Sequence, residues 1–319
     1  MSSTPAGSLS ASGLTLDRQW RKLAMQRRFY TALALILLFG ALFASLDYAN
    51  SANAGDFFER LPYFFDFTSW LIPKDWNDVW RALFDIAPPI DNGTEATYYQ
   101  LGRVYLFGDV YLPEYFELML ITLNIAILST IIGAVGGGLL CFLAARNTLP
   151  NPWIRGIARR IAELFRAFPE IVIAGLFAAV LSIGPIAAII AVGIHTIGAL
   201  GKMFYEVVEN TDMKASEGLT ASGANWIERM RFGVVPLVLP NFVSYTLLRL
   251  EINVRASTII GAVGGGGIGQ ELKLAISRGF GAKTLALVLL LFITIVIVDN
   301  LSAYLRRKLV GEQAFANFA

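Results

Sequence analysis

The sequence alternates between long apolar runs and short polar segments that carry most of its charge. Runs of about 20 apolar residues, the length that a helix needs to cross a bilayer, recur along the chain. The clear ones lie near residues 29–46, 118–145, 241–262 and 284–304. Each predicts a transmembrane helix.

A further apolar stretch, from Ile171 to Gly201, contains no charged side chain and is too long for one helix. Ser182-Ile-Gly-Pro185 in its middle indicates a turn. We therefore expect two spans here, at about 161–182 and 186–206. The predicted fold class is an all-α membrane protein with six transmembrane helices.

The basic residues indicate the topology. They cluster before the first span and after the second, fourth and sixth spans, around Arg18–Arg28, Arg146–Arg160, Lys214–Arg231 and Arg306–Lys308. Six crossings put all these clusters on one side, which the positive-inside rule identifies as the cytoplasm. Both termini are therefore expected to be cytoplasmic, as a basic tail over 1–28 and a short tail over 306–319.

The amino-terminal region also has features of a secretory signal peptide, because a basic segment precedes the apolar run and Ala52-Asn-Ala54 follows it. The run is long for a signal sequence and close to the length of a spanning helix. We therefore expect a retained first transmembrane helix at 29–46. The aromatic-rich segment at 47–114 would then be periplasmic or interfacial, either as an interfacial helix or as a docking surface for an external partner.

Composition narrows the function classes. Of the 319 residues, 55% are hydrophobic and 16% are charged, with a net charge of +2, and the mean hydropathy is +0.58. The bilayer is thus part of the solvent, and no nucleic acid partner is indicated. The single cysteine, Cys141, cannot form an internal disulfide, and the single histidine, His195, cannot form a histidine cluster for a metal.

No group of His, Cys or paired carboxylates in the sequence is suited to hold a metal or activate a nucleophile. We therefore expect no enzyme activity, no metal site and no cofactor on this chain. No P-loop motif occurs either, so any ATPase must be another chain.

The loop between the fourth and fifth predicted spans, at 207–240, is the most informative segment. From Glu217 to Pro236 it is rich in helix-forming residues and has a turn at Gly223-Ala224, which predicts two short helices under the membrane. A connector between spans needs only a few residues. We therefore interpret the loop as a docking element for a partner protein rather than as a plain connector.

This loop resembles the coupling loop of ABC-importer permeases, whose pattern is Glu-Ala-Ala, three residues, Gly, nine residues, Ile, one residue and Leu-Pro. Glu217, Gly223 and Pro236 stand at the matching spacing. Gly218 and Leu219 replace the two alanines, and Gly233 and Val235 replace the Ile and Leu. The resemblance implies that an ATPase subunit receives this loop in a groove, with Glu217, Gly218, Gly223, Ala224 and Pro236 as its coupling residues.

A closer resemblance is to the phosphonate-importer permeases (PhnE type), which are binding-protein-dependent inner-membrane components. It is carried by Leu71–Trp76, Phe142–Asn147, Arg166–Glu170, Glu251–Arg255 and Gly261–Gly269, and it covers most of residues 71–305. It implies a type I ABC-importer permease fold with a five-helix core at 115–305. The chain would be a multi-pass permease subunit of the bacterial plasma (inner) membrane.

The same resemblance implies the partners. Besides membrane lipid, these are two copies of an ABC ATPase that hold ATP and Mg, a second copy of this chain as a homodimer, and a periplasmic or lipid-anchored substrate-binding protein. The implied substrate is phosphonate, with phosphate, phosphite or a methionine-like solute as alternatives. A secondary transporter, which would need no docking loop for a cytoplasmic partner, is the rival function class.

The predicted fifth span carries Arg249, Glu251 and Arg255 within otherwise apolar sequence. Buried charge in a membrane indicates a functional site by default. Glu251 and Arg255 are four residues apart and share a helix face, so we expect them to pair. Either this pair is structural, or Arg255, Glu251 and Asn253 line the translocation path, where a guanidinium suits a phosphonate group.

A glycine run follows this span. Gly264, Gly265, Gly266, Gly267 and Gly269 would break the helix as a flexible outer gate or form a simple turn; a dinucleotide site is not expected because no strand precedes them. The segment Ser129–Gly138 has the same sequence as Ser257–Gly266. We interpret this repeat as small residues, such as Gly133 and Gly137, that let helices approach closely.

Overall fold

The computed structural model describes residues 8–52, 57–60, 62–73, 75–84, 86, 104–106, 110–149, 151–279 and 281–310. The chain divides into two compact units, Met1–Ser69 and Trp70–Ala319. The first unit contains α1 (Ser8–Ala52) and α2 (Phe57–Arg60), and α3 (Tyr63–Leu71) ends just past the boundary.

Helix α1 is 45 residues long and extends well beyond the predicted span at 29–46 on its amino-terminal side. The basic segment that we expected to be a separate tail is helical, because Leu14–Phe39 contains neither glycine nor proline and is rich in residues that favour helix. The segment Trp20–Ser51 is long and apolar enough to cross a membrane, and none of its most apolar stretch is buried. Such a helix is suited to contact with lipid.

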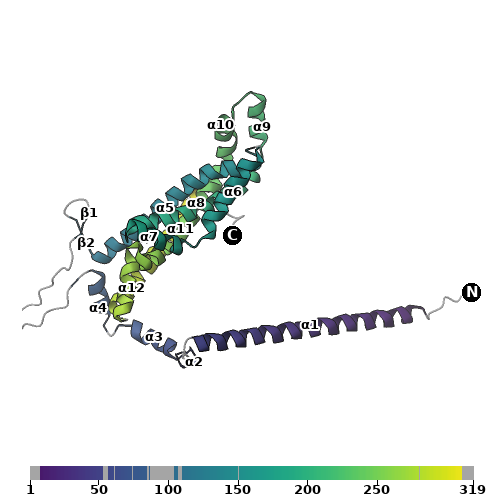
Figure 1. Cartoon of the computed structure of the whole chain (residues 1–319), viewed down its shortest axis with the longest axis horizontal. Coiled ribbons are helices and arrows are strands. Elements are labelled where there is room, and N and C mark those ends of the chain that lie inside the picture. The colour runs from purple at the N-terminus through teal and green to yellow at the C-terminus, as the bar shows by residue number, and fades with distance from the viewer. Residues whose placement is uncertain are drawn as a thin grey trace, which may run out of the picture. The chain divides into compact units, whose positions relative to one another are not determined.

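The second unit is a helical bundle with one small hairpin (Figure 1). Its elements are α4 (Trp76–Leu83), β1 (Val104–Leu106), β2 (Val110–Leu112), α5 (Glu114–Ala144), α6 (Pro152–Ala167), α7 (Glu170–Leu181), α8 (Pro185–Glu209), α9 (Lys214–Ala221), α10 (Trp226–Glu228), the π-helical turn η1 (Arg229–Val234), α11 (Val235–Ile260), the π-helical turn η2 (Gly261–Gly265), α12 (Ile268–Arg278) and α13 (Ala282–Val310). The hairpin is antiparallel, with Tyr105 opposite Tyr111. The protein is therefore nearly all-helical rather than strictly all-α.

By length and composition, five helical segments of the described chain could cross a membrane. They are Trp20–Ser51, Glu114–Ala144, Pro185–Glu209, Trp226–Gly265 and Ala282–Leu309. The bent pair α6–α7 would make a sixth. The predicted number of spans is reached only if this pair is counted as one crossing.

The predicted third span, 161–182, is not one helix. Helix α6 ends at Ala167, α7 begins at Glu170, and the two are bent by 84°. Pro169 has no N–H to continue the helix, and it favours extended backbone at the preceding residue, where Phe168 has φ −81° and ψ 132°. The expected third span is therefore bent sharply at Pro169.

The bundle is held together by close helix packing. Helix α5 lies against α8, where a Cβ atom added to Gly137 would lie 2.8 Å from the backbone N of Gly201. A Cβ atom on Gly133 would likewise overlap the side chain of Thr196. The prediction that these small residues let helices approach closely is confirmed.

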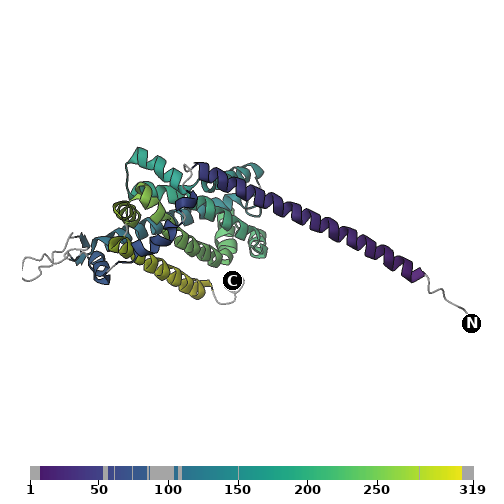
Figure 2. The same ribbon diagram turned by 90° about the horizontal axis from the view of Figure 1, so that it is seen from below.

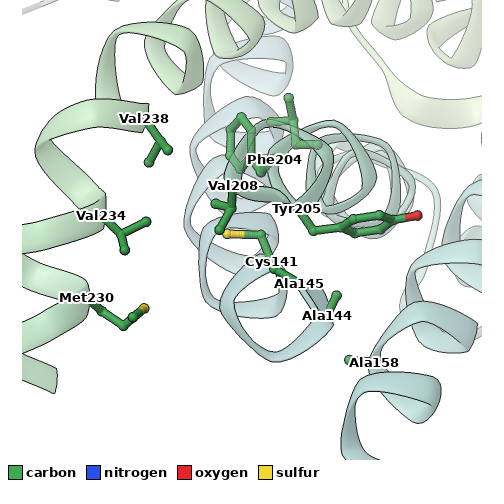
Figure 3. Close-up of a cluster of buried hydrophobic side chains, with 11 residues drawn as sticks. Cys141, Ala144, Ala145, Ala158, Phe204, Tyr205, Val208, Met230, Val234 and Val238 are labelled. Atoms are coloured by element: carbon green, nitrogen blue, oxygen red, sulfur yellow. The ribbon is translucent and has the colours of Figure 1, made fainter. Parts of the chain in front are cut away.

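An apolar cluster fills the bundle near the end of α8 (Figure 3). Phe204 of α8 stacks on Phe242 of α11 with ring centroids 4.0 Å apart, and Cys141, Val208 and Val238 are fully buried around them. Helix α13, the yellow-green helix that ends near the C-terminus in Figure 2, packs along α11. The core thus joins α5, α8 and α11, and α13 covers another side of α11.

Candidate functional site

A helical projection extends from one end of the bundle (Figure 1). It consists of α9, the turn at 222–225 and α10, and we call residues 214–228 the docking loop. Helices α4 and α12 lie at the opposite end of the bundle (Figure 1). The two short helices expected between the fourth and fifth spans are therefore present, and they reach beyond the neighbouring helices.

The tip of the docking loop has a defined backbone conformation. Gly223 has φ +85°, in the left-handed region, where an L side chain is strained. Its N–H donates to the carbonyl of Thr220 at 3.0 Å, and the N–H of Ala224 donates to that of Leu219 at 3.0 Å. This pair of bonds is a Schellman motif, which ends α9 and sets the direction of the chain that follows.

The second helix of the loop, α10, has its own N-terminal cap. The side chain of Asn225 accepts a hydrogen bond from the N–H of Glu228 at 3.0 Å, and the Glu228 carboxylate accepts one from the N–H of Asn225 at 2.8 Å. This reciprocal capping box holds α10 directly after the turn. The loop is therefore a shaped protrusion.

Most of the predicted coupling residues are available to a partner. Glu217, Gly218 and Gly223 are exposed, and a Cβ atom on either glycine would meet no atom within 4 Å. Ala224 is partly buried beneath the turn, and Pro236 is exposed in the first turn of α11.

Gly233 explains one departure from the coupling-loop pattern. A Cβ atom on it would lie 3.0 Å from Cα of Ser216, so the glycine lets η1 approach α9 closely. A bulky Ile at this place would push the two elements apart.

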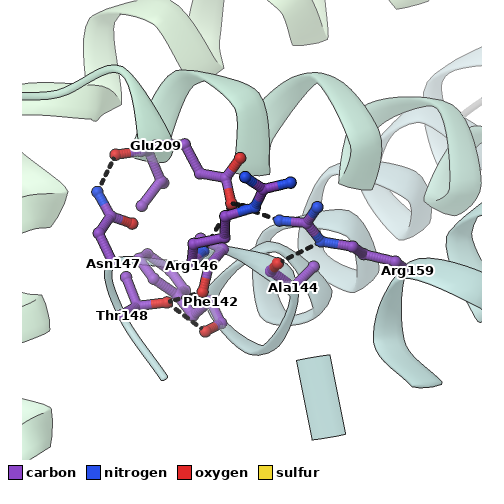
Figure 4. Close-up of polar contacts among 9 residues, drawn as sticks. Phe142, Ala144, Arg146, Asn147, Thr148, Arg159 and Glu209 are labelled. Atoms are coloured by element: carbon purple, nitrogen blue, oxygen red, sulfur yellow. Dashed lines mark hydrogen bonds and ion pairs between the residues drawn. The ribbon is translucent and has the colours of Figure 1, made fainter. Parts of the chain in front are cut away.

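Polar contacts anchor the base of the docking loop to the bundle (Figure 4). At the end of α8, the Glu209 carboxylate accepts a hydrogen bond from the backbone N–H of Arg146 at 2.6 Å and forms an ion pair with Arg159. Arg159 also donates to the carbonyl of Ala144 at 2.9 Å, and Asn147 donates to that of Val208 at 2.7 Å. These contacts tie α5, α6 and α8 together where the loop begins.

A further hydrogen bond joins the loop itself to this region, from the indole N–H of Trp226 to the carbonyl of Thr148 at 2.9 Å. The docking loop is therefore held to the segment that follows α5. Sequence reasoning had not identified Glu209 or Trp226 as anchors. Their partners lie 50 to 78 residues away in the chain, so no local pattern indicates them.

The expected pairing of Glu251 with Arg255 is wrong. Arg255 contacts Asp299 of α13, with Nη2 to Oδ2 at 2.6 Å, and Glu251 contacts Arg306 of α13, with Oε1 to Nη2 at 2.9 Å. The two residues do share a helix face, but that face is packed on α13, which supplies a closer opposite charge to each. These contacts hold α11 and α13 together.

Asn253 lies apart from Glu251 and Arg255. It is fully buried, and its amide donates to the hydroxyls of Thr130 of α5 at 2.9 Å and Thr196 of α8 at 3.2 Å. The three residues predicted to line one path are thus divided between two sides of α11.

A group of charged and polar side chains lies beside Asn253 at the meeting of α7, α8 and α11. Arg249 is 8% exposed; its Nη2 lies 2.5 Å from Nδ1 of His195, and its Nε donates to the Thr196 hydroxyl at 3.4 Å. Nε2 of His195 lies 3.7 Å from Oε2 of Glu170. The sequence indicated the buried charge of Arg249 but not its partners, because they come from other helices.

The glycine run breaks the helix as predicted. Gly264, Gly266 and Gly267 have positive φ angles of 117°, 77° and 68°. The N–H of Ile268 donates to the Thr122 hydroxyl of α5 at 3.0 Å, which holds the start of α12.

The break is closely packed against its surroundings. A Cβ atom on Gly269 would lie 1.9 Å from the carbonyl O of Thr258, and one on Gly265 would lie 3.0 Å from Cβ of Ala188. Whether the run acts as an outer gate remains a prediction.

Comparison with known proteins places residues 137–311 in the family described as "Binding-protein-dependent transport system inner membrane component". The chain is 35% identical over 189 residues to the phosphate-import permease protein PhnE of Mycolicibacterium smegmatis, a match that covers 59% of this chain and 36% of that protein. The chain thus spans little more than a third of that relative.

Two further relatives are matched over more of their length. The phosphite transport system permease protein PtxC of Stutzerimonas stutzeri is 35% identical to this chain. The match covers 58% of this chain and 68% of PtxC. A cryptic phosphonate transport system permease protein, PhnE2, of Escherichia coli is 44% identical to this chain. The match covers 38% of this chain and 99% of PhnE2.

Among solved structures, the MetNI methionine ABC transporter in inward-facing conformations has a similar chain. The TM-score is 0.55 and the identity 22%, over 61% of this chain and 95% of that one. An amino acid ABC transporter crystallised with histidines gives a TM-score of 0.51 and 16% identity, over 61% and 96% of the two chains. At these identities the likeness shows the fold, which is that of a type I ABC-importer permease.

Proposed function

The chain belongs to the family of binding-protein-dependent transport system inner membrane components, and on this premise we propose that it is the membrane-spanning subunit of an ATP-driven importer. The family consists of multi-pass proteins of the inner membrane that are not enzymes. In the proposed assembly the chain forms the path along which a phosphorus oxyanion crosses the membrane. ATP and Mg would be bound by the partner ATPase.

The observation that carries this proposal is the docking loop. Glu217 and Gly223 stand at the spacing of a coupling loop, and both are exposed on the projection, Glu217 in α9 and Gly223 in the turn that follows it. The base of that projection is tied to α5 and α8 through Glu209 and Trp226. An ATPase subunit that grips the tip could therefore move the ends of the spans, whereas a secondary transporter would have no use for the projection.

The proposed partners follow from this role. Two ATPase subunits would each receive one docking loop, which requires two copies of this chain. A periplasmic or lipid-anchored binding protein would deliver the substrate from the other side. Phosphonate or a related phosphorus oxyanion is the proposed substrate because relatives are named for phosphonate, phosphite and phosphate transport.

The first test concerns the backbone of Gly223. Gly223→Ala places a side chain at φ +85°, which costs about 1–2 kcal/mol, so ATPase binding and oxyanion uptake should fall by about tenfold. Co-purification of the ATPase subunit and uptake of radiolabelled phosphite, phosphate and methylphosphonate in cells provide the measurement. Gly223→Asn should retain most of the uptake, because asparagine tolerates this conformation.

Gly218→Ala is the matched control. Gly218 is exposed in the same loop, has room for a Cβ atom and lies inside α9, where alanine favours the helix. Gly218 is itself a predicted coupling residue, but alanine is what the coupling-loop pattern has at this position, so this substitution should leave ATPase binding and uptake unchanged. Equal effects of the two alanine substitutions, or full activity of Gly223→Ala, would show that the loop conformation does not couple the chain to an ATPase.

A further inference from the structure

The group formed by Glu170, His195 and Arg249 lies deep in the bundle. Arg249 is 14 residues after Val235, the first residue of α11, which corresponds to about 21 Å along the helix. Arg249 is 8% exposed and lies against α7 and α8, so it is shielded from lipid at the surface of the bundle. A ligand of Arg249 would therefore have to enter the bundle.

The contacts determine how the charge of Arg249 is balanced. A guanidinium can only donate, so Nδ1 of His195 accepts its hydrogen bond at 2.5 Å. In the neutral ring the remaining N–H is then at Nε2, which lies 3.7 Å from the Glu170 carboxylate. Arg249 and Glu170 are thus separated by an imidazole ring and form no direct ion pair.

The other two charged residues of α11, Glu251 and Arg255, each form a direct ion pair with a side chain of opposite charge. Arg255 lies 2.6 Å from the Asp299 carboxylate, and Glu251 lies 2.9 Å from the Arg306 guanidinium. Within the described residues, no carboxylate oxygen lies within 4.0 Å of Arg249. Arg249 is therefore the cation of this helix that lacks a direct anionic partner.

We propose that Arg249, rather than Arg255, is the side chain that contacts the phosphorus oxyanion during its passage, which rests on the proposed function above. A guanidinium has five N–H donors in a planar fork that matches two oxygens of a tetrahedral oxyanion. Among the described residues, its Nε donates to Thr196 and its Nη2 to His195, which leaves the other N–H donors of the fork without a hydrogen-bond acceptor there. The remaining N–H groups of the guanidinium can donate hydrogen bonds to an anion that binds and is then released.

Glu170 and His195 would make the binding of an oxyanion to Arg249 transient. With no anion present, the imidazole and the carboxylate behind it compensate the buried charge. An incoming oxyanion would take the place of the imidazole as hydrogen-bond acceptor, and the imidazole would take it back on release. For passage through a transporter, the anion must bind strongly enough to enter the site and weakly enough to leave it.

Glu170 is also the first residue of α7, directly after the break between α6 and α7. Discontinuous helices of this kind form substrate sites in other transporters.

The test uses the complete transporter in cells, with radiolabelled phosphite, phosphate and methylphosphonate as probes. Arg249→Gln removes the cation, and the balanced double variant Glu170→Gln with Arg249→Gln removes both charges, so that no uncompensated buried charge remains to disturb folding. In both variants we expect uptake to fall by about tenfold or more, the loss expected when a charged donor to the anion is removed. ATPase co-purification and ATP hydrolysis stimulated by the binding protein should persist in the double variant.

Arg249→Lys should retain more uptake than Arg249→Gln, because it keeps the charge but not the fork. The control is the double variant Glu251→Gln with Arg306→Gln, which also neutralises a buried pair, between α11 and α13, and should keep wild-type uptake. Wild-type uptake in the double variant at 170 and 249 would overturn this inference and show that the group is only structural. An unmodified transporter that takes up none of the three anions would overturn the proposed function, and this inference with it.

Discussion

Asn253 is the polar side chain that joins α5, α8 and α11. It is fully buried and donates to the hydroxyls of Thr130 and Thr196. Asn253→Ala removes both hydrogen bonds and should lower the free energy of unfolding by about 1 kcal/mol, since such bonds contribute modestly inside membrane proteins. Thermal unfolding of the purified protein in mild detergent measures the change.

Asn300→Ala is the control for this prediction. Asn300 is exposed on α13, and its amide donates to the carbonyl of Val296 on its own helix. Its replacement should change the free energy of unfolding by less than about 0.5 kcal/mol. A loss as large as that of Asn253→Ala would contradict a joining role for Asn253.

At the scale of single residues, the sequence identifies which side chains are unusual but not which ones meet. Arg249, Glu251 and Arg255 are recognisable as charges in an apolar span. Their partners, His195, Arg306 and Asp299, are supplied by α8 and α13. The spacing rule for residues four apart applies to an isolated helix, and here contacts with neighbouring helices override it.

The glycines of α5 differ in how closely they approach α8. A Cβ atom on Gly137 would lie 2.8 Å from the backbone N of Gly201, whereas one on the adjacent Gly138 would meet nothing within 4 Å. Gly137→Ala should therefore separate the helices and destabilise the protein by about 1–3 kcal/mol, the range found for overpacked cores. Gly138→Ala should leave the thermal stability in detergent unchanged or slightly raised.

At the scale of helices, most spans are predictable from apolar runs, and their ends depend on single residues. Pro185 begins α8 close to the predicted position. Pro169 instead divides the expected third span into two helices at 84°. The difference is that Pro185 follows Gly184 at a true turn, while Pro169 interrupts helix-forming sequence on both sides.

At the scale of the molecule, one chain presents one docking loop. If two ATPase subunits drive transport, the proposed assembly contains two copies of this chain related by twofold symmetry. Native mass spectrometry of the purified transporter should then give a mass with two copies of the 34.9 kDa chain. One copy per particle, or a different membrane subunit opposite it, would contradict the proposed homodimer.

The sequence by itself determined the membrane class, the main spans, the docking loop and the family, because long apolar runs and a spaced motif depend only on local composition. Tertiary structure decided the rest, and the repeated segment shows why. Ser129–Gly138 lies entirely within α5, whereas the identical Ser257–Gly266 leaves α11 and turns through Gly264 and Gly266.

Glycine has little intrinsic preference between these two conformations, so the neighbours select between them. In α5, Gly133, Gly136 and Gly137 lie against α8. After α11 a fourth glycine, Gly267, follows, and Thr122 accepts the N–H of Ile268 at 3.0 Å, which stabilises the turn and the start of α12. Side-chain partners drawn from distant helices likewise decided the environments of Arg249, Glu251 and Arg255, because burial in a bilayer strongly favours whichever opposite charge or hydrogen-bond acceptor the fold brings nearest.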